Sequence, residues 1–171
     1  RAEAMDRLAH EDFMTGLANR TRCEEMFFDL GHSKGVFALI SIDINYLKLT
    51  NDRYGHQEGD RLLIDFSKVM KGACENEPVT AGRMGGDEFV VIIPGLENDV
   101  DQRIVEKMDK LGEELNADRK PLPLSFSYGI CRSNDAAVSG SSDIVEAVYR
   151  VADERMYEMK KNMKARREDV G

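Results

Sequence analysis

Two consecutive carboxylates stand beside a glycine pair near the middle of the chain, in the segment Gly85-Gly86-Asp87-Glu88-Phe89. A glycine pair between strand-forming segments is typical of a β-hairpin turn. The strand that follows is apolar on both faces, so charge at its mouth is costly to desolvate unless a metal ion compensates it. The glycines also let a ligand approach the backbone closely. An ordinary surface hairpin with solvated acids would explain the same residues.

A further carboxylate, Asp43, lies at the end of an apolar run. Residues 36–44 read Val-Phe-Ala-Leu-Ile-Ser-Ile-Asp-Ile, a pattern that predicts a strand covered on both faces. If this strand pairs with the strand after the glycine pair, Asp43 and Asp87 lie side by side. Two such oxygen ligands suit Mg²⁺, which keeps several waters and takes its other ligands from substrate phosphates. The two segments together therefore predict a metal-assisted phosphate site at the strand ends.

The stretch after Asp43 adds groups that suit a nucleotide. Lys48 supplies a cation for phosphate, and Asn51 and Asp60 supply an amide and a carboxylate that could recognise a base edge. For an isolated lysine a solvated surface position is the usual alternative, and only the register of the surrounding motifs argues against it.

Six blocks of this sequence, in order from about residue 12 to residue 160, resemble the GGDEF domain of the diguanylate cyclase family. They are residues 12–20 (similar to DxLTGLxNR), 43–52 (DxDxFKxxND), 55–60 (GHxxGD), 85–89 (GGDEF), 127–130 (SxG) and 152–160 (ADxxMYxxK). A single five-residue match would be a weak signal, and six in order are a specific one.

The resemblance implies a magnesium site, with Mn²⁺ as a possible substitute. Asp43 and Asp87 would be side-chain ligands of up to two ions, and the carbonyl of Ile44 a main-chain ligand. Asp87 would also help to deprotonate the attacking 3′-hydroxyl. Glu88 would assist the metal site, or else orient a neighbour as a hydrogen-bond acceptor.

The resemblance also implies the substrate contacts. Asn51 and Asp60 match the positions that hold the guanine edge, where a carboxylate can accept from both N1–H and the 2-amino group. The phosphates would be held by lysines, and the glycine pair would lie against the nucleotide. Arg83 would stabilise charge in the transition state. The phosphate-binding and backbone positions are Lys48, Lys160, Lys164, Gly85 and Gly86.

The activity implied is the condensation of two GTP molecules into cyclic di-GMP with release of two pyrophosphates. Two domains would meet face to face as a homodimer, each 3′-hydroxyl attacking the α-phosphorus of the other nucleotide. One alternative is a non-catalytic GGDEF module that binds GTP or only dimerises, and Asp43 and Asp87 argue against it. Another is a cyclase with a different nucleotide choice, and Asp60 argues against that.

Periodic patterns predict the elements that must position these residues. Apolar residues at helical spacing predict helices over residues 20–30, 57–73, 100–115 and from 143 onward, and alternation predicts a strand over 124–130. Asp143 and Glu146 form a capping-box pattern for the last helix. With the hairpin, these elements indicate an α+β protein with helices packed on a mixed sheet. The resemblance makes it the palm-like, ferredoxin-related nucleotidyl cyclase fold, a mixed central β-sheet flanked by helices.

Composition limits the class of protein. A length of 171 residues predicts one domain, and a formal net charge of −8 opposes general affinity for nucleic acid. Three widely spaced cysteines suggest neither a disulfide framework nor a zinc site, in keeping with a reducing cytoplasm. No apolar stretch approaches the ~20 residues of a membrane span.

The chain opens Arg-Ala-Glu-Ala with neither an initiator Met nor a signal peptide, which suggests a piece of a longer protein. Residues 1–11 are charged and helix-prone, and we interpret them as the end of a connecting helix from an upstream sensory module. Residues 12–171 are expected to form the GGDEF catalytic domain. We expect this domain to be a cytoplasmic part of a larger sensor protein.

Several positions depart from the family pattern. Asn45 replaces the second Asp of DxDxFK and Leu47 replaces its Phe, with little loss expected. Lys164 stands where many members carry the Arg of a GRN motif, which keeps a cation without its bidentate grip. Residues 76–79, Asn-Glu-Pro-Val, lack the RxxD motif through which many members bind their own product, so product inhibition is not expected there. The family's final strand is not evident in residues 165–171.

Overall fold

The computed structural model describes residues 1–170, with side chains described through residue 166. Its strands are β1 (Ala38–Ile44), β2 (Thr80–Gly85), β3 (Glu88–Ile93) and β4 (Phe126–Arg132). Its helices are α1 (Ala2–His10), α2 (Arg20–His32), α3 (Leu47–Tyr54), α4 (His56–Cys74), α5 (Val100–Asn116) and α6 (Ile144–Val170), with a short 3-10 helix, η1 (Ala136–Val138). No helix among the described residues is both long enough and apolar enough to cross a membrane.

The strands form one four-stranded sheet in the order β2-β3-β1-β4. All three ladders between these strands are antiparallel, and an isolated bridge between Ala18 and Gly82 adds a parallel pairing. The expected α+β class is confirmed. A mixed sheet was expected, and the one parallel pairing among the described residues is that isolated bridge. The predicted pairing of β1 with β3 is also confirmed, with Asp43 opposite Glu88.

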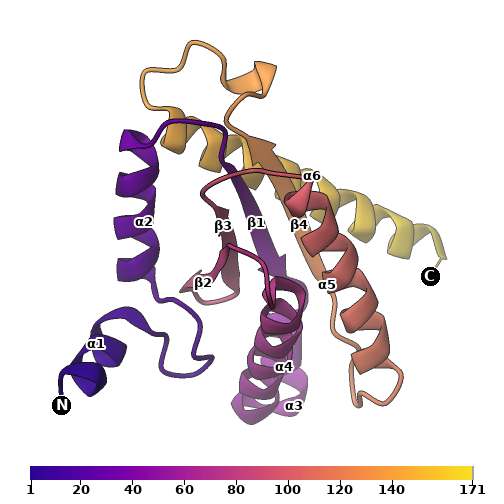
Figure 1. Ribbon diagram of the computed structural model, residues 1–171. Coiled ribbons are helices and arrows are strands. Elements are labelled where there is room, and N and C mark those ends of the chain that lie inside the picture. The colour runs from indigo at the N-terminus through magenta and orange to yellow at the C-terminus, as the bar shows by residue number, and fades with distance from the viewer. Residues whose placement is uncertain (171) are drawn as a thin grey trace.

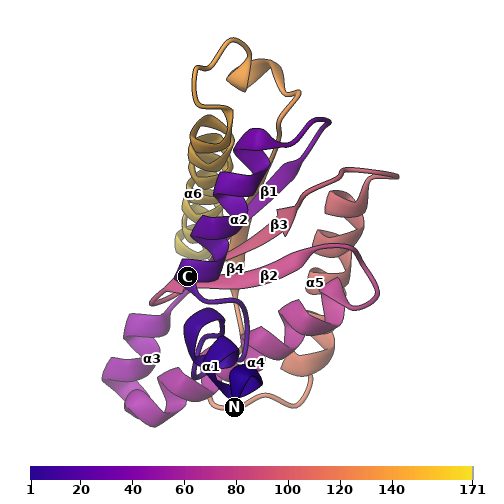
Figure 2. The same ribbon diagram turned by 60° about the vertical axis from the view of Figure 1, so that its left-hand side comes forward.

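Helices cover both faces of the sheet, and Figures 1 and 2 show the two layers from different sides. Apolar residues of α4 and α5 pack on one face, against Ile40, Ile42 and Phe89 among others. Apolar residues of α2 and α6 pack on the other face, against Leu39, Val90 and their neighbours. Both faces of β1 are therefore buried, as its unbroken apolar run predicts.

The long helix α6 lies unusually close to β4. A methyl group built on Gly129 would lie 2.1 Å from the carbonyl oxygen of Ala152 and 2.3 Å from the amide nitrogen of Met156. Since both are backbone atoms, any side chain at this position would push α6 away from the sheet. The predicted cap also forms, because the Glu146 amide donates to the Asp143 carboxylate over 3.1 Å. Gly129 thus allows the close packing of the helix that carries Lys160 and Lys164, two of the three predicted phosphate-binding lysines.

Other elements differ from expectation. Helix α2 continues through Gly31 to His32, and α3 is a helix that the apolar pattern does not predict. Helix α6 extends through residues 165–170, so these residues are helical where the family's final strand was sought. Gly171 lies outside the described residues.

Candidate active site

The predicted carboxylate pair meets at the end of the sheet. Asp43 is the penultimate residue of β1, and the amide of the next residue, Ile44, donates to the carbonyl of Asp87 over 3.0 Å. Asp87 itself lies in the turn between β2 and β3. This backbone bond fixes the turn against the end of β1, which places the Asp87 and Asp43 side chains in one locality. The predicted juxtaposition is confirmed at this level.

The Asp43 carboxylate is buried and incompletely paired. Its residue is 8% exposed, and Oδ2 lies 2.5 Å from Nζ of Lys160 on α6. Its other oxygen, Oδ1, is buried without a hydrogen-bond partner among the described residues. Burial raises the pKa of Asp43 to about 6, with Lys160 opposing the rise and the Asp87 charge adding to it. An unsatisfied, buried carboxylate oxygen of this kind needs a cation or a donor to complete it.

The donor set fits a magnesium ion. Asp43 Oδ1, the Asp87 carboxylate and the Ile44 carbonyl at the same strand end are all hard oxygen ligands, the type that Mg²⁺ prefers. Among the described residues no group of three or more His, Cys, Asp or Glu side chains is placed to hold a metal. An ion held by these oxygens would take only part of its coordination shell from the protein, which suits Mg²⁺ because it completes its shell with water and phosphate oxygens.

The turn beside these carboxylates is open. Gly86 and Asp87 form the turn, one position later than the expected Gly85-Gly86 turn, because Gly85 is the last residue of β2. The two glycines have φ angles of 148° and 53°, and a methyl group on either would meet nothing within 4 Å. Glycine is the residue that adopts such backbone angles without strain. The space over the turn is thus free for a ligand to approach the backbone.

Phe89, the last residue of the motif, anchors the turn in the core. Its ring is 1% exposed and packs edge-on against Phe66 of α4, with centroids 4.9 Å apart. Truncating a phenylalanine buried in this way costs about 3–5 kcal/mol. The turn is therefore attached directly to the main core of the domain.

Arg83 binds the backbone of the Gly86-Asp87 turn. Its Nε and Nη2 donate to the Gly86 carbonyl over 3.1 and 2.8 Å, and its Nη1 lies 3.3 Å from the Asp12 carboxylate. Its side chain is 13% exposed. These contacts give Arg83 a positioning function at the turn, and its expected contact with transition-state charge stays a prediction.

Asp12 is a residue to which sequence reasoning assigned no function. Besides Arg83, its Oδ2 accepts from both the amide and the hydroxyl of Thr15, over 2.9 and 2.7 Å. Burial acts to raise the pKa of Asp12, but the Thr15 bonds and Arg83 outweigh it and hold the pKa below its usual value. The only sequence signal was its place as the first residue of the DxLTGLxNR-like block.

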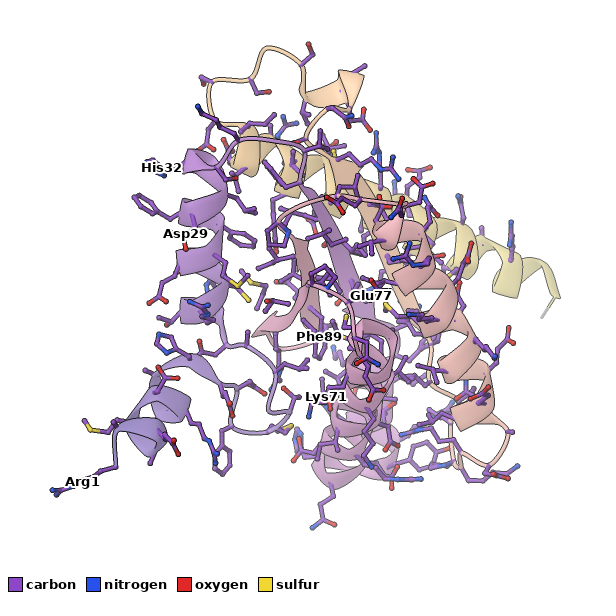
Figure 3. All side chains as sticks on the ribbon, in the orientation of Figure 1. Arg1, Asp29, His32, Lys71, Glu77 and Phe89 are labelled. Carbon is purple, nitrogen blue, oxygen red and sulfur yellow. The ribbon has the colours of Figure 1, made fainter. Side chains whose placement is uncertain are left out.

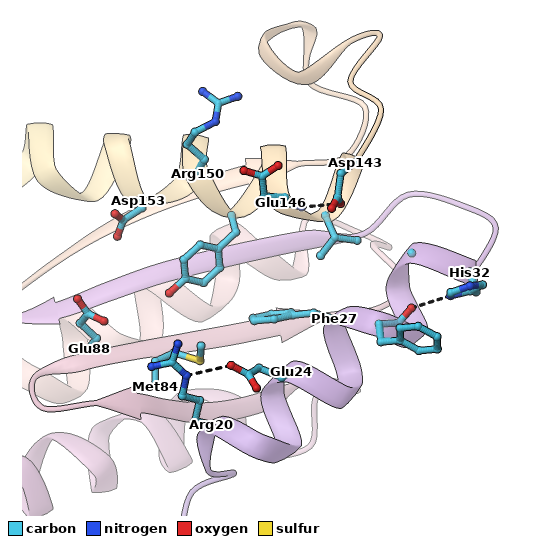
Figure 4. Close-up of a pocket in the computed structure, with 14 residues that line it drawn as sticks. Arg20, Glu24, Phe27, His32, Met84, Glu88, Asp143, Glu146, Arg150 and Asp153 are labelled. Atoms are coloured by element: carbon cyan, nitrogen blue, oxygen red, sulfur yellow. Dashed lines mark hydrogen bonds and ion pairs between the residues drawn. The ribbon is translucent and has the colours of Figure 1, made fainter.

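Glu88 lies opposite Asp43 in the ladder and is exposed. It lies at the edge of a groove of about 810 Å³ between α2 and α6, which Figure 4 shows with Phe27, Met84 and Asp153 among its lining residues. Asp43 does not line this groove. Glu88 thus faces the same side of the sheet as Asp43 and opens onto solvent, and its expected help to the metal stays a prediction.

The predicted guanine-binding residues come together on α3 and α4. Asn51 of α3 packs against Gly59 of α4 so closely that a methyl group on Gly59 would lie 1.7 Å from Asn51 Oδ1. Asp60 is the next residue along α4 and is exposed. The glycine of the GHxxGD block therefore allows the Asn51 amide to approach the helix turn that carries the Asp60 carboxylate.

The three predicted phosphate-binding lysines belong to two elements. Lys48 is exposed in the first turn of α3, which follows β1 almost directly. Lys160 and Lys164 are four residues apart on α6 and so share one helix face. Of these, Lys160 is in contact with Asp43.

Asn45 connects the end of β1 to β4 and α6. Its Nδ2 donates to Ser125 Oγ over 3.0 Å and its Oδ1 accepts from Ser127 Oγ over 3.0 Å, while Met163 Sδ lies 3.8 Å away. The residue is 5% exposed. An amide suits this position because it donates and accepts at once, which a carboxylate does not. Asn45, which departs from the family pattern, is therefore accommodated by a hydrogen-bond acceptor at Ser125 and a donor at Ser127.

Comparison with known proteins agrees with this geometry. The family model described as "Diguanylate cyclase, GGDEF domain" matches residues 9–166. Diguanylate cyclase A of Treponema denticola is 34% identical over 134 residues, which are 77% of this chain and 34% of that protein. The chain thus spans about a third of the length of this relative.

Solved structures show the same fold. The diguanylate cyclase SiaD of Pseudomonas aeruginosa, crystallised with its activator SiaC, superposes with a TM-score of 0.78 at 23% identity, over 94% of this chain and 62% of that one. The coiled coil and GGDEF domain of DgcB from Caulobacter crescentus, in complex with c-di-GMP, gives a TM-score of 0.75 at 24% identity, over 94% and 85%. Since the family model covers nearly the whole chain, and the motif residues assemble at one end of the sheet, this chain belongs to the GGDEF family of diguanylate cyclase domains.

Proposed function

We propose that this domain condenses two GTP molecules into cyclic di-GMP and two pyrophosphates, with Mg²⁺ and as a face-to-face homodimer. The observation that carries the proposal is the buried, half-paired Asp43 carboxylate fixed beside the Asp87 turn by the Ile44–Asp87 backbone bond. A structural hairpin would have no use for an unsatisfied buried carboxylate oxygen. The family membership and the named activity of the Treponema relative support the same reaction.

The chain's own residues divide the work between binding and proton transfer. Asp43, Asp87 and the Ile44 carbonyl would hold the metal, which lowers the pKa of the attacking hydroxyl and neutralises phosphate charge when bound. Asp87 then accepts the proton of the 3′-hydroxyl. Asn51 and Asp60 orient guanine.

The remaining residues position the phosphates and the turn. Lys48, Lys160 and Lys164 offset phosphate charge, and Arg83 keeps the Gly86 carbonyl, and with it the turn, in place. In this reaction class most of the rate enhancement comes from positioning and electrostatics. An upstream sensory module would bring two domains together in the cytoplasm, since one domain holds only half of the reactants.

The test is incubation of the purified domain with Mg²⁺ and either GTP or ATP, followed by chromatography of the products. We expect cyclic di-GMP from GTP alone, and none from an Asp87→Asn variant whose melting temperature shows that it is folded. Full activity of Asp87→Asn would refute the mechanism. Binding of GTP without turnover at high protein concentration would instead identify a non-catalytic module.

A further inference from the structure

Lys160 reaches the predicted metal-binding carboxylate from a distant part of the chain. Its Nζ lies 2.5 Å from Asp43 Oδ2, although the two residues are 117 positions apart. The Lys160 side chain is 37% exposed, whereas that of Asp43 is 11% exposed. The ammonium therefore sits at the mouth of the site and the carboxylate beneath it.

The ammonium of Lys160 thus occupies the Asp43 carboxylate, which the proposed reaction needs for a divalent metal ion. A divalent ion bound to Asp43 and an ammonium 2.5 Å from the same carboxylate repel one another at short range in a poorly solvated place. The Lys160 side chain has a long, flexible stem and is exposed enough to turn toward solvent. It lies on the same helix face as Lys164, the other lysine of α6 that is predicted to bind phosphate.

We propose that Lys160 competes with the divalent metal for Asp43, and that it moves from this carboxylate to the nucleotide's phosphates when the metal binds. The proposal rests on the proposed function, because it takes Asp43 as a metal ligand and GTP as the nucleotide. Its consequence is positive coupling: phosphate draws Lys160 away from Asp43 and so favours metal binding, and metal releases Lys160 for phosphate. By linkage the two ligands must strengthen each other by the same factor.

The test measures metal binding to the protein without turnover. Mn²⁺ is titrated into EDTA-treated, dialysed protein at pH 8, with free Mn²⁺ followed by electron paramagnetic resonance, first alone and then with a non-hydrolysable GTP analogue. The variant is Lys160→Met, which keeps an unbranched apolar stem and removes the charge. The matched control is Lys161→Met, at a neighbouring exposed lysine whose ammonium lies 5.1 Å from the Tyr157 ring centroid.

Without nucleotide, we expect Lys160→Met to bind Mn²⁺ about fivefold or more tightly than the unmodified protein. Lys161→Met controls for the general loss of one positive charge and should stay close to the unmodified protein. Lys160→Arg keeps a cation against Asp43 and should restore weak binding. The strengthening of Mn²⁺ binding by the GTP analogue should shrink in Lys160→Met.

Several outcomes would overturn the proposal. These are Mn²⁺ binding by Lys160→Met that is equal to or weaker than that of the unmodified protein, an equal gain in Lys161→Met, or no detectable binding in any variant. Failure of the proposed function is separate, because absence of GTP turnover in the unmodified protein leaves the Mn²⁺ comparison intact. A thermal melt of each variant confirms that the proteins compared are folded.

Discussion

At the scale of single residues, Asp43 combines three conditions that rarely coincide in a structural carboxylate. It is buried, one oxygen is paired with Lys160 and the other has no partner among the described residues. Burial raises its pKa to about 6, so the folded protein holds this proton more tightly than the unfolded chain, whose value is near 3.8. Such a residue reduces stability, and carboxylates with a pKa perturbed in this way are concentrated at functional sites.

The first prediction concerns stability and pH. Because the folded state binds the Asp43 proton more tightly, the contribution of Asp43 to the free energy of unfolding should fall as pH rises from 3.8 to about 6. Asp43→Asn lacks this proton equilibrium and should be the more stable protein at pH 8 in EDTA, by at most about 3 kcal/mol, with the advantage shrinking toward pH 4. Urea unfolding of both proteins at several pH values measures it. A pH-independent difference would contradict the assigned cause.

The second prediction concerns Asn45, where the family pattern has Asp. Asn45→Asp should destabilise this chain by about 1–3 kcal/mol at pH 7, although it restores the family residue, because it places a charge in a site built for an amide. Ser125 and Ser127 would both have to donate to it, and Asp43 lies two residues away. The loss should diminish at pH 4.5, where the new carboxyl is partly protonated. The measurement is the free energy of unfolding from chemical denaturation. An unchanged value at pH 7 would show that Ser125 and Ser127 can both donate to the new carboxylate without loss.

At the scale of elements, the periodicity of apolar residues was sufficient to predict the helices and strands that bury an apolar face. The apolar run of β1, the helical spacing of α4 and α5 and the cap of α6 all lie where the pattern predicts. Helix α3 has only Thr50 buried, so it carries no apolar period to detect.

The sequence predicted those parts of the candidate site whose residues lie within one motif or on strands that pair. It did not predict contacts that depend on the packing of distant elements. The Asp43–Asp87 juxtaposition followed from the pairing of two strands. The Lys160–Asp43 contact did not follow from spacing, because 117 residues separate the pair and packing of α6 on β4 brings them together. The clamp of Asp12 on Arg83 spans 71 residues and was hidden for the same reason.

The third prediction tests that clamp. Asp12→Asn removes the charge that Arg83 and Thr15 share, and we expect a loss of about 1–2 kcal/mol in stability. Activity should fall further than stability explains at saturating GTP, because Arg83 would hold the Gly86 carbonyl less firmly. Glu24→Gln is the control, since its pair with Arg20 is exposed on both sides and contributes little. Equal activity of the two variants would contradict a positioning function for the contact between Asp12 and Arg83.

At the scale of the whole molecule, the domain holds one set of the predicted nucleotide-binding residues, and the proposed reaction needs two. The expected boundary between a connecting helix at residues 1–11 and a catalytic domain from residue 12 stays a prediction, although residues 2–10 are helical as α1. Helix α1 buries none of its residues against the domain. Its side chains therefore contribute little to the core of the domain, although His10 Nε2 lies 3.3 Å from the Glu25 carboxylate of α2.

The fourth prediction follows from this arrangement. Specific activity should rise with protein concentration, and fusion of a dimerising coiled coil before residue 1 should raise it at low concentration by increasing the effective concentration of the partner. Initial rates across a hundredfold dilution series, with sedimentation of the same samples, measure the effect. Flat specific activity in a protein that sediments as a monomer would exclude the face-to-face dimer.

The last prediction concerns product inhibition. The segment that would carry the RxxD motif holds Glu77, whose carboxylate lies 3.1 Å from Nη2 of Arg103 and 3.3 Å from Nζ of Lys107 on α5; Figure 3 labels it. The Arg103 bond, with help from Lys107, holds the pKa of Glu77 below its usual value. An internal carboxylate thus already engages the cations to which an anionic product could bind, in a segment without the family's arginine.

We therefore expect added cyclic di-GMP to inhibit only by competition with GTP, so that saturating GTP restores the full rate. Initial rates against product concentration at low and saturating GTP distinguish the two modes. Calorimetry with an Asp43→Asn variant, in which binding at the active site is weakened, should detect no second site. Glu77→Gln frees Arg103 and Lys107 and should give at most weak, salt-sensitive product binding, because ion pairs at an exposed surface are screened. Micromolar, non-competitive inhibition of the unmodified domain would show that another surface binds the product.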